Sequence, residues 1–184
     1  MALTAAIYIC GGISGGHVNP GVTLGLASIG KISWLKVPHY LLSQFLGAFF
    51  GALITFMIYS DVIDKKYDGY HVVGENATAG IFGTFPDPQS HIGAVFLEQV
   101  SRQRFCIFVF RPGSDCSPNS LFTKVVASAF FLLLINAITD KKNTNCPRGL
   151  IPIAIGITDL SLMILTFSYN SGAPINPARD FSPR

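Results

Sequence analysis

The chain has 184 residues, of which 49% are hydrophobic and only 12% are charged. A soluble domain carries about 25% charged residues, so this composition excludes an ordinary soluble fold and favours membrane helices. The formal net charge of +3 is small and scattered over the chain, which excludes a nucleic-acid-binding surface.

The first two apolar stretches are both shorter than the roughly 20 residues that a membrane span needs. We interpret residues 1–13 as the end of a longer helix. Residues 19–29 predict a helix of about 16 Å, roughly half the hydrocarbon thickness. Asn19 can cap its first backbone N–H groups, and Pro20 fits the first helical position because no N–H is needed there.

Residues 39–59 form a full span of about 31 Å at helical rise. The segment that follows, residues 60–92, is polar and is expected to be a loop. It contains the sequon Asn76-Ala77-Thr78, and we expect glycosylation at Asn76.

Residues 93–100 and 126–139 are apolar, but neither segment alone crosses a bilayer. Joined, they give a helix of about 33 Å, so we expect residues 101–125 to be an insertion into one span. The alternative is that residues 121–139 are the span and that Lys124 extends toward the interface. Residues 150–168 are the next span.

A second Asn-Pro phrase, Asn176-Pro177-Ala178, lies near the end of the sequence and predicts a second helix start. Three spans separate the two phrases, and this odd number places them on opposite sides of the membrane. Basic residues lie in the connections on one side, which we expect to be cytoplasmic. Two half-helices entering from opposite sides are typical of a transport pathway.

Such a pathway needs donors for uncharged solutes and a barrier to cations. The two helix N-termini would place positive potential where they meet. Asn19 and Asn176 could donate to a passing water or hydroxyl group. Arg179, three residues further on, could donate to a solute and repel cations.

Four segments carry a family resemblance: SGGHVNPGVT at 14–23, ATAGIFGTFP at 77–86, ITDKKN at 138–143 and NSGAPINPARDFSPR at 170–184. On these the chain resembles the major intrinsic proteins, the aquaporins, and within them the aquaglyceroporins. The resemblance implies an all-α membrane fold, an inverted repeat of helices with two re-entrant half-helices. Residues 1–184 would be one partial channel domain, truncated at both ends.

The resemblance also implies roles for individual residues. Asn19 and Asn176 would be the pore asparagines, in motifs completed by Pro20, Gly21, Pro177 and Ala178. The selectivity filter would include Arg179, Ala173 and Ile164. His17 would be a pore-proximal histidine. Glu98 and Gln99 would brace the re-entrant loop. Asp180 and Arg184 would mark a glycerol-conducting member.

Three positions depart from what the family leads us to expect. Gly21 stands where Ala is usual, and Gly weakens a helix by about 1 kcal/mol. Ile164 is bulkier than the residue that relatives of this type carry there, which would narrow the pore. Asp159 lies within a span, where an ionisable side chain is a functional candidate, but no family role matches it.

The resemblance implies a passive channel for glycerol, other small neutral solutes and water, without a cofactor. It would be a homotetramer in a lipid bilayer, and we expect the plasma membrane. Two alternatives remain open: a non-conducting subunit that associates with full-length partners, and a water-selective aquaporin. An enzyme is not expected, because no catalytic constellation or metal-ligand spacing can be assembled from the sequence.

Overall fold

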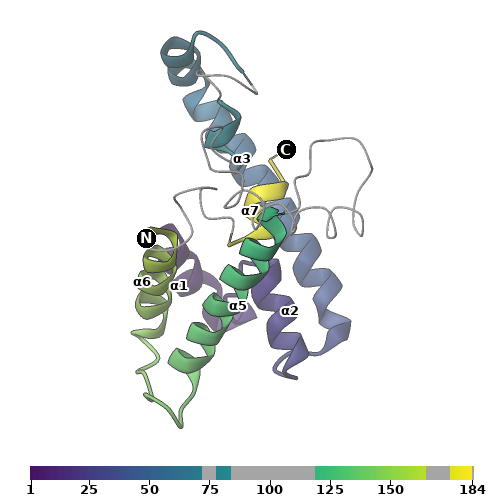
Figure 1. Cartoon of the computed structure of the whole chain (residues 1–184), viewed down its shortest axis with the longest axis vertical. Helices are drawn as coiled ribbons and strands as arrows, with labels where there is room; N and C mark the ends of the chain where they lie inside the picture. Colours follow the sequence, from purple (N-terminus) through teal and green to yellow (C-terminus); the bar gives the residue numbers. More distant parts are fainter. Residues whose placement is uncertain (72–77, 84–118, 165–174, 184) are drawn as a thin grey trace.

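The computed structural model describes residues 1–71, 78–83, 119–164 and 175–183, and it describes side chains of the helix at 119–139 from Ser128 onward. In these parts of the chain the regular elements are helices (Figure 1). The α-helices are α1 (Ala2–Ser14), α2 (Pro20–Ser28), α3 (Val37–Tyr67), α5 (Asn119–Thr139), α6 (Ile151–Leu162) and α7 (Pro177–Phe181). Two short 3₁₀ turns are η1 (Trp34–Lys36) and η2 (Ala79–Ile81).

The helices pack as a bundle around the two short helices α2 and α7. α1 and α6 lie side by side at one edge, and α5 packs against both α6 and α2. On the other side α3 contacts α2 and α7, which also contact each other. One apolar cluster joins these layers and comprises Ile7, Val22, Phe131, Ile135, Ile155, Leu162 and Ile175. This cluster places the start of α7 against the helices that surround α2.

Glycines allow two of these helix pairs to approach closely. A Cβ added to Gly25 of α2 would collide with the Leu132 side chain of α5. A Cβ added to Gly156 of α6 would collide with the Thr4 side chain of α1. Small residues at such positions are the usual means by which membrane helices pack, because lipid offers little hydrophobic drive for their association.

The two short helices begin where the sequence predicts. α2 has Asn19 as its N-cap and α7 has Asn176, and in each helix the proline that follows occupies the first turn. Each asparagine has extended backbone angles, as a capping residue should. The prediction of two half-helices is therefore confirmed.

α3 is longer than predicted. The polar residues after position 59 were expected to form a loop, but the helix continues to Tyr67. Its end comes at Asp68, which adopts left-handed backbone angles directly before Gly69. Charged side chains do not stop a helix, and Asp61 and Lys65 are spaced one turn apart, a favourable arrangement. With 31 residues, α3 is about 46 Å long and projects beyond the other helices (Figure 1).

α5 begins within the expected insertion. The helix is continuous from Asn119 to Thr139, as the alternative interpretation with a span over residues 121–139 requires. Residues 93–118, which include the rest of the proposed insertion, lie outside the described residues. The segment Trp34–Tyr67 is long and apolar enough to cross a membrane alone.

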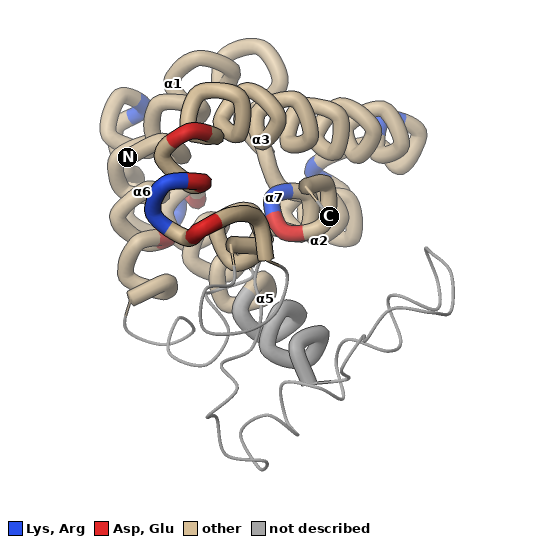
Figure 2. The backbone as a smooth tube through the Cα atoms, turned by 90° about the horizontal axis from the view of Figure 1, so that it is seen from above, with Lys and Arg blue, Asp and Glu red and all other residues tan. Residues whose placement is uncertain are grey.

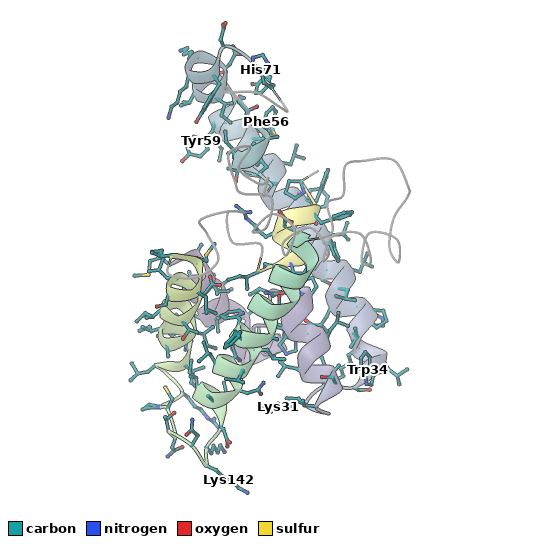
Figure 3. All side chains as sticks on the ribbon, viewed as in Figure 1. Lys31, Trp34, Phe56, Tyr59, His71 and Lys142 are labelled. Atoms are coloured by element: carbon teal, nitrogen blue, oxygen red, sulfur yellow. The ribbon has the colours of Figure 1, made fainter. Side chains whose placement is uncertain are left out.

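The two basic connections lie at the same end of the bundle. Lys31 follows α2, and Lys142 lies between α5 and α6; both lie at the end of the bundle opposite His71 (Figure 3). The Lys31 Nζ donates to Asn136 Oδ1 over 2.7 Å, which joins the end of α2 to the end of α5. The predicted placement of these charges on one side is confirmed.

Candidate solute pathway

Each asparagine cap binds backbone N–H groups of its own helix. Asn19 Oδ1 accepts from the Gly21 N–H over 2.8 Å. Asn176 Oδ1 accepts from the Ala178 N–H over 3.1 Å and from the Arg179 N–H over 3.4 Å. With the oxygen committed to the helix, the amide nitrogen of each asparagine must point away from it.

The two amide nitrogens bind reciprocally. Asn19 Nδ2 donates over 3.1 Å to the carbonyl of Ile175, the residue before Asn176. Asn176 Nδ2 donates over 2.8 Å to the carbonyl of Val18, the residue before Asn19. We call this pair of hydrogen bonds the asparagine junction. It joins helix starts that are 157 positions apart in the sequence, and it is the strongest evidence that the two half-helices meet at their tips.

A strained turn presents the Val18 carbonyl. Gly15 and Gly16 have φ values of 81° and 66°, and Val18 itself has a φ of 39°. A β-branched residue rarely adopts such an angle, and the cost is of order 1–3 kcal/mol. The hydrogen bond from Asn176 is one of the contacts that hold Val18 in this conformation. A Cβ on Gly16 would also press on Ile7, at 3.1 Å, so this loop lies directly against α1.

A buried threonine of the first half-helix links that helix to α3. Thr23 is fully buried, and its Oγ donates to the Asn19 carbonyl over 3.1 Å. The same oxygen accepts from Gln44 Nε2 over 2.9 Å. It also lies 3.2 Å from His17 Nδ1. Because its single proton is used for Asn19, the oxygen must accept from His17, which assigns the proton to Nδ1 and leaves Nε2 as an acceptor.

A cavity of about 510 Å³ adjoins the asparagine junction. Its walls come from the end of α1, the loop before α2, the first half of α3 and the start of α7. Its lining residues with polar groups include Ser14, His17, Tyr40, Gln44, Asn176 and Arg179. Tyr40 donates to the Ser14 carbonyl over 2.9 Å, and its ring lies 5.0 Å from the ring of His17, so this wall is held in place. The cavity is thus polar at the junction, and its α3 wall contains both larger polar side chains and the small residues Ser43, Gly47 and Ala48.

Two adjacent charged residues on α7 have opposite environments. Arg179 is exposed and lines the cavity. Asp180 is only 2% exposed and does not line it. Figure 2 shows the basic and acidic segments of α7 next to each other on an otherwise largely uncharged group of helices.

The other predicted site residues fall into two groups. Among the motif residues, Pro20 and Ala178 are buried, and Gly21 and Pro177 are half-buried beside their asparagines. Ile164 is 66% exposed, lies two residues after the end of α6 and does not line the cavity, so its predicted place in a filter stays a prediction. The predictions for Asn76, Glu98, Gln99, Ala173 and Arg184 lie outside the described residues.

Sequence reasoning missed Thr23, Gln44 and Tyr40. Gln44 carried the clearest signal, because an amide side chain within a span usually faces other polar groups rather than lipid. Thr23 lies four residues after Asn19, one turn along the same helix, where a hydroxyl can reach back to the i−4 carbonyl. Neither signal shows that the two side chains bind each other, since they come from different helices.

Comparison with known proteins matches this arrangement to one family. The family model described as Major intrinsic protein matches residues 1–184. The chain is 40% identical over 185 residues to Aquaporin-9 from Homo sapiens, covering 100% of this chain and 54% of the relative. It is 36% identical over 185 residues to Aquaglyceroporin-2 from Rhizophagus irregularis, covering 100% of this chain and 50% of the relative. The chain therefore spans about half the length of these curated relatives.

A solved structure supports the fold. The X-ray structure of the aquaglyceroporin from Plasmodium falciparum superposes with a TM-score of 0.69, at 24% identity, covering 97% of this chain and 60% of that chain. The helical fold with two re-entrant half-helices is the one that the sequence predicted. On the match over its whole length, this chain belongs to the major intrinsic protein family of integral membrane proteins.

Proposed function

We propose that the protein is a passive channel of the aquaglyceroporin branch, which conducts glycerol, other small neutral solutes and water. The observation that carries this proposal is the asparagine junction beside a cavity lined by Asn176 and Arg179. The similarity to Aquaporin-9 and to Aquaglyceroporin-2 supports the solute class.

The groups around the cavity match a hydroxyl-bearing solute. An amide nitrogen has two N–H donors, and Asn176 uses one of them on the Val18 carbonyl, which leaves the other for a solute. His17, in the tautomer assigned above, offers Nε2 as an acceptor on the same cavity. A hydroxyl group donates and accepts at once, so these two groups can bind it together. Ala48 offers a small apolar surface for the carbon atoms.

Charge then selects against cations. The guanidinium of Arg179 is always protonated and lines the cavity, so it repels a cation and can still donate to a hydroxyl. We propose the family's filter role for Arg179, with Ala173 and Ile164 as its further members. We also propose Asp180 and Arg184 as markers of glycerol conduction. The buried position of Asp180 supports an action through α7 rather than contact with the solute.

Localisation and assembly are proposals on the family resemblance alone. We propose that the protein resides in the plasma membrane as a homotetramer, with Asn76 glycosylated on the outer side. No catalytic role is proposed for any residue, and solute movement follows the concentration gradient.

The proposal is tested by solute flux into proteoliposomes. Liposomes that contain the purified full chain are mixed with a hypertonic glycerol solution, and their volume is followed by light scattering. They should shrink and then swell again as glycerol enters, but should stay shrunken in sucrose, a much larger solute. Swelling in glycerol no faster than that of empty liposomes would overturn the proposal.

A further inference from the structure

A third hydrogen bond completes the asparagine junction, and it comes from α5. Ser128 Oγ donates to the Ile175 carbonyl over 3.1 Å, and Asn19 Nδ2 donates to the same oxygen over 3.1 Å. A carbonyl oxygen has two lone pairs, so both acceptor sites of this carbonyl are used. We propose that Ser128 is a positioning residue of the solute pathway, which fixes the peptide between Ile175 and Asn176.

The packing of α5 on α2 brings Ser128 to this position. A Cβ built on Gly21 would lie 3.4 Å from the Cβ and Oγ of Ser128. One turn further along both helices, Gly25 lies against Leu132. The two glycines are four residues apart on α2, and their partners are four apart on α5. This spacing lets the two helix backbones approach, so Ser128 lies between the first half-helix and the start of the second.

The environment of the shared carbonyl makes the serine hydroxyl hard to replace. Ile175 is only 3% exposed, so bulk water cannot readily supply a donor in place of Ser128. Without it, the carbonyl keeps one donor, Asn19, and the peptide plane has more freedom to rotate. Asn176 begins at that peptide, and its amide both binds the Val18 carbonyl and lines the cavity. Ser128 therefore acts on the solute through Asn176 and touches no solute itself.

The first test measures backbone exchange and does not depend on conduction. Ser128→Ala, in the purified full chain in lipid nanodiscs, should speed hydrogen exchange at the amides of Ala178 and Arg179 at least fivefold, because Asn176 accepts from both. Ser128→Thr keeps the hydroxyl and should restore the wild-type rate. Ser128→Cys keeps the shape of serine but donates weakly, and it replaces the alanine variant in this measurement if that variant does not fold. Ser161→Ala is the matched control, because within the described part of the chain the Ser161 hydroxyl donates to the Ile157 carbonyl of its own helix.

The second test rests on the proposed function and measures the ratio of glycerol to water permeability. Ser128→Ala should change this ratio at least twofold, whereas a merely structural defect would lower both permeabilities together. Exchange rates unchanged by the alanine or cysteine variant overturn the inference, whether or not the wild type conducts. An unchanged permeability ratio in a conducting channel also overturns it. Faster exchange in a wild-type background that conducts no glycerol supports the positioning role and overturns the proposed function.

Discussion

At the scale of single residues, two neighbours on α7 show how one step along a helix separates a charge that lines the cavity from a charge that is buried. Consecutive residues on an α-helix point about 100° apart, since there are 3.6 residues per turn. Arg179 therefore lines the cavity while Asp180 turns into the protein. A cation about 4 Å from a guanidinium meets a repulsion of about 4 kcal/mol at an effective dielectric constant of 20.

Removal of this charge should open the pathway to cations. In proteoliposomes, Arg179→Ala should raise potassium flux at least tenfold while glycerol still passes, because the Asn176 amide and the small side chains remain. A potassium-sensitive dye reports the flux. Arg148→Ala, an exposed arginine in the connection between α5 and α6, is the control and should change nothing. Potassium flux that stays at the wild-type level would show that Arg179 does not form the barrier.

At the scale of elements, the contact between α2 and α5 depends on the absence of one side chain. Gly25 has no room for a Cβ because Leu132 fills the space beside it. Crowding a packed contact typically costs about 1–3 kcal/mol. Gly47 of α3, by contrast, has open space where its Cβ would lie, so alanine there should only gain helix propensity, by up to about 1 kcal/mol.

We expect Gly25→Ala to lower the free energy of unfolding by about 1–3 kcal/mol, through the collision with Leu132. Leu132→Ala should cost a similar amount through the lost packing. The double variant should cost clearly less than the sum, because the alanine at 132 makes room for the new methyl group. Unfolding by denaturant of the detergent-solubilised protein, followed by circular dichroism, measures each value. Strict additivity would contradict the contact, and Gly47→Ala serves as the control.

The elements also show what the sequence can predict. Asn followed by Pro predicted the starts of α2 and α7, because capping is local chemistry that acts within one helical turn. The predicted end of α3 at position 59 was wrong, because polar residues alone do not break a helix; α3 continues to Tyr67 and ends at Asp68, directly before Gly69. The bonds of Thr23 to Gln44, and of Ser128 to Ile175, join different elements, and no local pattern encodes them. Their identification needed the packing of α2 between α3 and α5.

At the scale of the whole molecule, α3 presents an apolar surface that the rest of the described chain does not cover. Its exposed residues include Leu42, Leu46, Phe49, Phe50, Leu53, Ile54, Met57 and Ile58. In an integral membrane protein this surface is covered by lipid or by further helices. The basic connections at one end of the bundle predict its direction relative to that lipid, since basic connections favour the cytoplasmic side.

The orientation can be checked with single cysteines in a background from which the four natural cysteines have been removed. Lys142→Cys should react with a membrane-impermeant maleimide only after the cells are made permeable. His71→Cys, at the opposite end of the bundle, should react in intact cells (Figure 3). The two variants serve as controls for each other. The reverse pattern would contradict the positive-inside assignment.

Because each asparagine of the junction binds a residue beside the other, the junction can form only late in the synthesis of the chain. The amide of Asn19 finds its acceptor on Ile175, 156 residues later in the chain. At about 5–20 residues per second, a ribosome needs roughly 8–31 s to make that acceptor available. During this interval the first re-entrant loop, with its unfavourable angle at Val18, lacks the hydrogen bond from Asn176. We therefore expect the first half of the protein to reach its final structure only after the second half has been synthesised.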